Sequence, residues 1–209
     1  MILNPVFEVV NAIGLVAFAL VGASKAVREE FDLFGVLIVG LLTAFGGGTT
    51  RDLLVDRMPL VLQTHWNVLF GVSGVVLAIG LLYAIDVPDE HHITVGADAA
   101  GLAAFATTGA IVASEAGVSA FGVVTIATIN AVGGGVLADI CLDRQPFILF
   151  QDFYASCAVL GGISFWIVSG FTASTTVPAA VCAGTTVFVR FVAIGRNWRL
   201  PAVSGLVVD

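Results

Sequence analysis

Long apolar stretches separated by short polar segments run along most of this chain. Each stretch approaches the roughly 20 mainly apolar residues that an α-helix needs to cross a bilayer. A helix also satisfies its own backbone hydrogen bonds, which is required where water is absent. The sequence therefore predicts an all-α integral membrane protein with seven transmembrane helices, at residues 6–23, 34–55, 66–85, 95–113, 120–142, 153–168 and 176–194.

The composition supports a membrane protein. The 209 residues are 58% hydrophobic and 11% charged, whereas soluble domains are about 25% charged. The first apolar stretch contains Glu8 and Asn11 and has no basic residue before it, so we expect a membrane helix there and not a cleaved signal peptide. The net charge of −7 gives no reason to expect a nucleic-acid partner, and membrane lipids are the expected surroundings.

The positions of Lys and Arg predict the orientation, because basic residues accumulate on the cytoplasmic side. If the N-terminus lies outside, only Arg51 and Arg57 face outward. The other six basic residues and the C-terminus are then cytoplasmic. This orientation is our expectation for the membrane protein. The six are Lys25, Arg28, Arg144, Arg190, Arg196 and Arg199.

An internal repeat relates residues 14–59 to residues 101–146 at a constant offset of 87, without a gap. Nineteen of the 46 aligned pairs are identical, including a glycine triplet, a following Asp and an Asp-Arg-x-Pro sequence. Chance matches in apolar sequence involve Ala, Val and Leu, so duplication explains this alignment better. We expect one transmembrane domain over residues 1–209, with repeat one at about 6–85, repeat two at about 93–170 and a seventh helix at about 176–194.

Each repeat holds three helices, an odd number, so the second repeat enters the membrane from the opposite side. The expected fold is a 3+3 inverted repeat plus one extra helix. Inverted repeats of this kind, related by a pseudo-two-fold axis in the membrane plane, are common in proteins that move solutes across bilayers.

The two glycine triplets are the main candidates for a functional site. Each glycine costs a helix about 1 kcal/mol relative to alanine, so we expect the second and fifth membrane helices to bend or unwind there. Irregular backbone at membrane depth must face protein or water. Close helix packing is the alternative role of such glycines. The expected pore-lining or hinge residues are Gly46, Gly47, Gly48, Gly133, Gly134, Gly135, Thr43, Thr49, Thr50 and Asn130.

Ionisable residues near the triplets are candidates for charges at pore mouths, because such residues are costly inside membranes and are often functional. We expect Arg51 and Asp52 at the outer mouth, with Arg51 paired to an acidic neighbour. Asp139 belongs to the inner mouth, where pairing with Lys25 would form a gate.

Enzymatic activity is not expected. Neither triplet continues into the Gly-Lys-Ser or Gly-Lys-Thr of a nucleotide-binding loop. The sequence has no clear set of nucleophile, base and acid. The three Cys residues lack metal-ligand spacing, and a metal site at His91 and His92 has little support. We therefore expect neither a metal site nor a cofactor.

The sequence resembles the prokaryotic branch of the trimeric intracellular cation (TRIC) channel family. The resemblance rests on the Gly-Gly-Gly-Thr-Thr-Arg-Asp motif at 46–52, the second triplet with Asp139, and the Asp-Arg-x-Pro sequences at 56–59 and 143–146. It implies a homotrimer with a hydrophilic pore in each protomer that conducts monovalent cations, potassium or sodium, with preference for potassium. It also implies that the two glycine triplets line the pore, and that the protein lies in the plasma membrane of a prokaryote.

Three possibilities remain open at this point, of which the third is a non-conducting structural membrane protein. The first is a potassium-permeable channel. The second is a secondary transporter of a small solute such as an amino acid, for example glycine, because an inverted repeat suits alternating access equally well.

Overall fold

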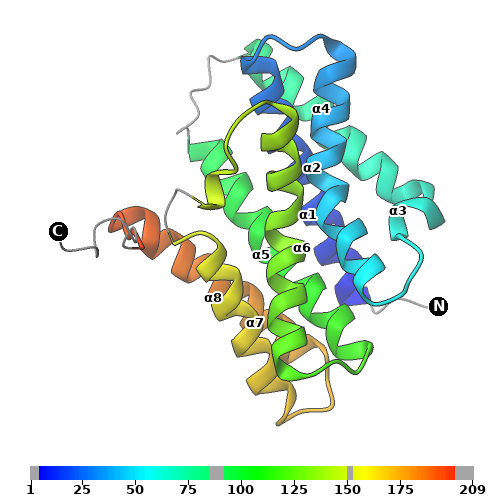
Figure 1. Ribbon diagram of the computed structural model, residues 1–209, viewed down its shortest axis with the longest axis vertical. Coiled ribbons are helices and arrows are strands. Elements are labelled where there is room, and N and C mark those ends of the chain that lie inside the picture. The colour runs from blue at the N-terminus through cyan, green and yellow to red at the C-terminus, as the bar shows by residue number, and fades with distance from the viewer. Residues whose placement is uncertain (1–4, 85–91, 150–152, 201–209) are drawn as a thin grey trace, which may run out of the picture.

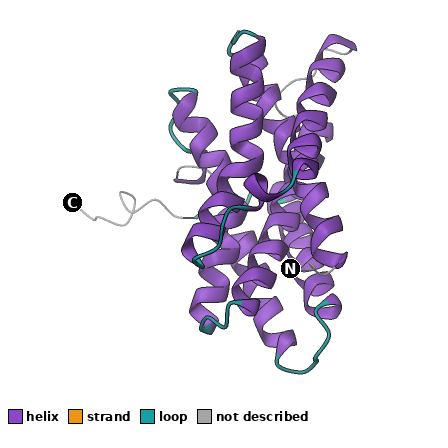
Figure 2. Cartoon of the chain, turned by 90° about the vertical axis from the view of Figure 1, so that its right-hand side faces the viewer, coloured by secondary structure: helices purple, strands orange, loops and turns teal. Residues whose placement is uncertain are grey.

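The computed structural model describes residues 5–84, 92–149 and 153–200, and every regular element in these ranges is helical. The elements are α1 (Pro5–Arg28), α2 (Leu33–Leu54), α3 (Leu60–Gln63), α4 (His65–Ala84), α5 (His92–Glu115), α6 (Ala120–Cys141), the 3-10 helix η1 (Phe147–Leu149), α7 (Ala155–Ser169) and α8 (Thr176–Gly195). Figure 2 shows these helices joined by short loops. The predicted all-α fold is confirmed.

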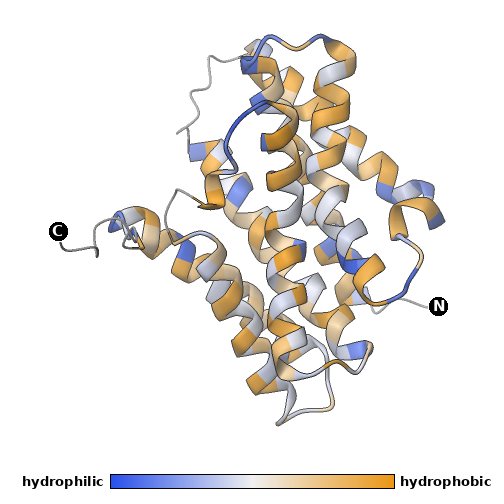
Figure 3. Cartoon of the chain, in the orientation of Figure 1, coloured by the Kyte–Doolittle hydropathy of each residue, from blue (hydrophilic) through white to orange (hydrophobic). Residues whose placement is uncertain are grey.

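Six of the helices are long and apolar enough to cross a membrane, and α7 is a shorter apolar helix. Hydrophobic residues cover most of the long helices in Figure 3, while hydrophilic residues gather at loops and helix ends. Many large apolar side chains are exposed on α4 and α8. A lipid environment accounts for this surface, since such area would be unfavourable in water.

The central helices are α1, α2, α5 and α6 (Figure 1). Helix α1 packs against α2, α4 and α5, while α6 packs against α2, α5 and α7. Helix α8 lies against α5 and α7, at one side of the bundle.

The offset of 87 found in the sequence also relates the structural elements, and we call residues related by it equivalent. The bounds of α1 and α5, and those of α2 and α6, differ by this number. The N-caps Asp32 and Ser119 are equivalent, and each accepts a hydrogen bond from the backbone N–H three residues later. After α2 and α6, the equivalent Asp56 and Asp143 both have positive φ angles, 55° and 53°. Both halves therefore fold in the same local way.

Equivalent helices run antiparallel to one another. Gly47 of α2 lies against Asn130 of α6, and Gly134 of α6 lies against Thr43 of α2. Thus positions later in α2 meet positions earlier in α6. The same reciprocal pattern joins α1 to α5, where Phe18 and Phe105 meet edge to face with ring centroids 5.0 Å apart. These contacts support the expected inverted repeat.

The glycine triplets do not unwind their helices, contrary to one of our expectations. Both α2 and α6 continue as α-helices through Gly46–Gly48 and Gly133–Gly135. Close packing explains the difference: a Cβ atom at Gly47 or Gly134 would collide with a backbone carbonyl of the opposite helix. The packing that glycine permits offsets its low helix propensity.

Candidate functional site

A cavity of about 370 Å³ lies beside Asp139, and we call it the charged vestibule. Five ionisable side chains line it together with smaller and apolar residues. Its lining residues are Val21, Lys25, Thr94, Val95, Asp98, Asp139, Arg144, Gln145, Phe147 and Arg190.

A second cavity of about 350 Å³ lies between α1, α3 and α4, and we call it the apolar vestibule. Among its lining residues only Glu8 carries a charge. The lining consists of Phe7, Glu8, Val9, Asn11, Ala12, Leu60, Thr64, Trp66, Asn67 and Phe70.

The two vestibules occupy equivalent places in the two halves of the fold. Four residues of the apolar vestibule have their equivalents in the lining of the charged vestibule: Phe7 with Thr94, Glu8 with Val95, Asn11 with Asp98, and Leu60 with Phe147. Because the halves run antiparallel, the vestibules belong to opposite ends of the bundle. They differ mainly in charge.

A narrow cavity of about 20 Å³ leads inward from the apolar vestibule. It shares Asn11, Leu60 and Asn67 with that vestibule and is also lined by Gly48 and Arg51. A space of this size holds about one water molecule. The predicted residue Thr49 and the aromatic Phe105 also line it.

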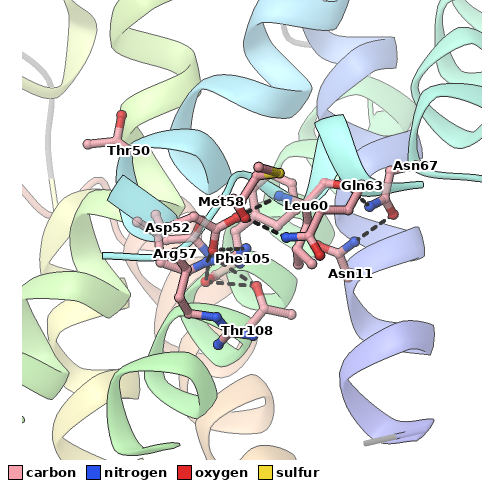
Figure 4. A network of polar contacts seen from close by, with 12 residues as sticks. Asn11, Thr50, Asp52, Arg57, Met58, Leu60, Gln63, Asn67, Phe105 and Thr108 are labelled. Atoms are coloured by element: carbon pink, nitrogen blue, oxygen red, sulfur yellow. Dashed lines mark hydrogen bonds and ion pairs between the residues drawn. The ribbon is translucent and has the colours of Figure 1, made fainter. Parts of the chain in front are cut away.

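Arg51 and Asp52 form an ion pair at the inner side of this narrow cavity. Each residue is only 1% exposed, so the structure places both inside the protein and not at an open mouth. Arg51 Nε donates to Asp52 Oδ1 at 2.8 Å, and Asp52 Oδ2 accepts from the backbone N–H of Leu60 at 2.9 Å. Figure 4 shows Asp52 beside Leu60 and Asn11 pointing toward Asn67. The pairing expected for Arg51 is therefore made with its own neighbour.

Lys25 and Asp139 form the corresponding pair in the charged vestibule. Lys25 Nζ lies 2.8 Å from Asp139 Oδ1, so the expected ion pair is present and joins α1 to α6. Asp139 Oδ2 accepts from the backbone N–H of Phe147 at 3.1 Å. The side chain of Lys25 is 22% exposed, while that of Asp139 is 3% exposed. Only the lysine of this pair therefore has substantial contact with the vestibule space.

The two Asp residues are equivalent, but their cations come from different places. The equivalent of Arg51 is Ala138, and the equivalent of Lys25 is Val112. Each carboxylate caps the short helix that follows its own long helix. Both therefore have a structural role in addition to any effect on ions.

Asn130 holds α6 to α5 in the buried centre. Its Nδ2 donates to the carbonyl of Phe105 at 2.5 Å and to Thr108 Oγ1 at 3.0 Å. Two buried polar atoms nearby, Asn130 Oδ1 and Arg51 Nη1, have no hydrogen-bond partner among the described residues. Because Gly48 has no side chain, there is open space beside these atoms. A Cβ atom added at Gly48 would lie 3.8 Å from Asn130 Oδ1 and from Arg51 Nη2. This polar space adjoins the narrow cavity.

The glycines of the triplets divide into two kinds. Gly47 and Gly134 form the crossing of α2 and α6, where no side chain fits. Gly48 and Gly135 have room for a methyl group, with the nearest atoms at 3.8 and 3.5 Å respectively from an added Cβ. Gly48 faces the narrow cavity, and Gly135 faces Phe147 of the charged vestibule. Gly46 and Gly133 belong with the closely packed pair, because Gly46 lies against Leu137 and Gly133 lies against the backbone of Gly47.

The predicted threonines near the first triplet bind their own helix. Thr43 Oγ1 donates to the carbonyl of Val39 at 2.7 Å, and Thr50 Oγ1 donates to the carbonyl of Gly46 at 2.9 Å. Thr43 is buried against Gly22 of α1. Among the three predicted threonines, Thr49 is the one that lines the narrow cavity.

Sequence reasoning missed three residues of the charged vestibule region. Asp98, Tyr154 and Arg190 form a cluster in which Tyr154 donates to Asp98 at 2.8 Å and Arg190 contacts Asp98 at 3.3 Å. The offset of 87 offered one signal, because it pairs Asn11 with Asp98 and so marks a neutral position that carries a charge in the second repeat.

Comparisons with known proteins agree with this architecture. A family model described as "Glycine transporter" matches residues 8–84 and 96–170. The UPF0126 membrane protein YvgT of Bacillus subtilis is 34% identical over 200 residues, which cover 93% of this chain and 95% of the relative. A UPF0126 membrane protein of Deinococcus radiodurans is 35% identical over 198 residues, which cover 91% and 89%.

Solved structures of TRIC channels are similar over nearly the whole chain. One, from a study of conductance through TRIC cation channels, has a TM-score of 0.84 and 34% identity and covers 94% of this chain and 96% of its own. The TRIC orthologue from Rhodobacter sphaeroides has a TM-score of 0.82 and 26% identity, with coverage of 93% and 100%. The chain therefore belongs to the glycine-transporter (UPF0126) family of membrane proteins and to the prokaryotic TRIC family.

Proposed function

We propose that this protein is a monovalent cation channel, permeable to potassium, with one pore in each protomer of a homotrimer. The observation that carries the proposal is the pair of equivalent vestibules at opposite ends of the bundle, with the crossing of α2 and α6 between them. The similarity of the fold to that of TRIC channels supports both parts of the proposal, cation conduction and trimeric assembly.

In the proposed channel, this conformation is closed. A narrow cavity of about 20 Å³ does not admit a hydrated ion, since it holds about one water molecule. Opening requires that the contacts around Gly48, Arg51 and Asn130 loosen, which the unfilled space beside Gly48 would permit. The unpartnered Asn130 Oδ1 is an oxygen ligand of the kind that a potassium ion prefers in a pore.

Carboxylates at the two ends would favour cations, because a negative charge near a narrow aqueous path raises the local cation concentration. In the charged vestibule Asp139 is engaged by Lys25, and this ion pair is the inner gate of our proposal. We propose that this vestibule faces the cytoplasmic side of the plasma membrane, with the N-terminus outside, an orientation that the distribution of Lys and Arg supports.

Planar-bilayer recording of the purified protein under asymmetric potassium and sodium gradients tests the proposal. We expect unitary currents whose reversal potential indicates that the channel is selective for cations. Gly48→Val should reduce the current by filling the space beside the narrow cavity. Gly80→Val is the matched control, because an added Cβ at Gly80 meets nothing within 4 Å.

A secondary transporter would give a different result. Saturable, coupled uptake of a small solute such as glycine into proteoliposomes, without unitary currents in bilayers, would contradict the channel and support transport instead. The description "Glycine transporter" of the matching family model makes glycine the first solute to test.

A further inference from the structure

The two vestibules differ at one equivalent contact, which joins α1 to α4 in the first half and α5 to the N-cap residue of α7 in the second. In the apolar vestibule, Asn11 Nδ2 donates to Asn67 Oδ1 at 3.2 Å. The equivalent residues near the charged vestibule are Asp98 and Tyr154, where the Tyr154 hydroxyl donates to Asp98 Oδ1 at 2.8 Å. A neutral pair in one half therefore corresponds to a pair with a carboxylate in the other.

The cation opposite this carboxylate comes from α8, the helix that has no counterpart in the repeat. Arg190 Nη2 lies 3.3 Å from Asp98 Oδ2, and its guanidinium carbon lies 4.5 Å from the ring centroid of Tyr154. The extra helix thus provides a countercharge at the one equivalent contact where the second half carries an acid.

Both members of this pair remain accessible to the vestibule. The side chains of Arg190 and Asp98 are 16% and 18% exposed, and both residues line the cavity. Asp139, in contrast, is 3% exposed and already engaged by Lys25 and by a backbone N–H. Asp98 is therefore the more exposed of the two carboxylates in the vestibule lining.

The remaining charges nearly balance. Arg144 contacts Glu29 as well as lining the cavity, and Lys25 is paired with Asp139. In such a vestibule, a change in the pairing of one exposed carboxylate alters the local potential substantially, because low-dielectric walls focus the field of each charge.

We propose that Asp98 is a cation-attracting residue of the charged vestibule, and that Arg190 of α8 sets how much of its negative charge a permeating cation encounters. The inference rests on the proposed channel function and names a part of the pathway that is separate from the glycine crossing. It assigns to α8 an electrostatic role: movement of this helix away from α5 would leave Asp98 without its cation and raise the cation concentration in the vestibule.

Single-channel conductance of charge variants at two salt concentrations tests this role. Arg190→Gln should raise potassium conductance roughly twofold, and Asp98→Asn should lower it by a similar factor. These effects should appear at about 10 mM salt, where the screening length is about 30 Å, and disappear at about 1 M, where it is about 3 Å. The double variant should conduct like the wild type.

Two controls separate electrostatics from a structural role. Arg196→Gln removes the same charge just after α8, at an exposed position outside the vestibule lining, and should change nothing. Arg190→Lys keeps the charge and should keep the low-salt conductance. Asp98→Asn is nearly isosteric and can still accept a hydrogen bond from Tyr154. Arg190→Gln shortens the side chain and removes its charge without adding volume, so size-exclusion chromatography should show the wild-type oligomer for both.

The outcomes distinguish this inference from the proposed function. Wild-type protein without unitary currents would overturn the channel itself. Wild-type currents combined with unchanged conductance in Arg190→Gln and Asp98→Asn would overturn the role of Asp98 alone. A change of equal size at both salt concentrations would also overturn it, since that result indicates altered packing of α8.

Discussion

Gly47 of α2 lies directly against the backbone carbonyl of Asn130 of α6, and the equivalent Gly134 makes the same contact with Thr43. Two helices that run antiparallel therefore cross at a point where neither can carry a side chain. This crossing lies between the two vestibules, so its geometry controls how closely the halves of the protein approach.

Replacement of Gly47 by alanine should destabilise the protein by about 1–3 kcal/mol, because the added Cβ meets backbone, which cannot rotate away as a side chain can. Thermal unfolding of the purified protein in detergent measures the effect. Gly80→Ala is the control: its Cβ meets open space, and the helix should gain up to about 1 kcal/mol. A Gly47→Ala protein as stable as the Gly80→Ala protein would contradict the close crossing.

Asp139→Asn should raise the open probability of single channels, because it removes the ion pair that joins α1 to α6. The amide oxygen can still accept from the backbone N–H of Phe147, so the fold should persist. Lys25→Gln, which breaks the same pair from the other side, should give the same direction of change. Unchanged gating in both variants would eliminate the inner gate.

Arg51 and Asp52 should be strongly coupled in stability. Removal of either charge leaves the other buried, and truncating one partner of a buried pair costs about 3–5 kcal/mol. We expect Arg51→Gln and Asp52→Asn each to be strongly destabilised, and the double variant to lose much less than the sum. Unfolding in detergent, arranged as a double-mutant cycle, gives the coupling. Additive losses would show that the pair does not act as a unit.

Phe18→Ala should destabilise the contact between α1 and α5 by about 3–5 kcal/mol, since the ring is buried and deletion leaves a cavity. Phe18 is 3% exposed and meets Phe105 edge to face. Phe188→Ala is a matched control, because that ring is 69% exposed on α8. The comparison uses the same thermal unfolding measurement, and similar losses for both variants would argue against a stabilising role for the central pair.

Much of the fold could be predicted from hydropathy and the repeat. The bounds of the seven predicted helices agree with the structure to within five residues, whereas the short helices α3 and η1 were not expected. Both are only one turn long, so they bury too few apolar residues to leave a pattern. Their positions are equivalent, which shows that the offset of 87 extends into the loops.

The candidate site was predicted less completely. The glycine triplets, Lys25, Asp52 and Asp139 stood out because polar or flexible residues are unusual in apolar stretches. The role of each individual glycine could not be predicted, since packing and cavity lining depend on which helix lies opposite. The triplets also suggested unwinding, which the reciprocal contacts of Gly47 and Gly134 make unnecessary.

The sequence by itself determined that the chain forms membrane helices in two related sets of three with a seventh helix, because a span must supply its apolar length and hydrogen bonds locally. Only the tertiary structure decided that Arg190 of α8 meets Asp98 of α5 and that Arg51 and Asp52 are buried together. The reason is physical: hydropathy is a property of neighbouring residues, whereas an ion pair between residues 92 positions apart depends on how whole helices pack.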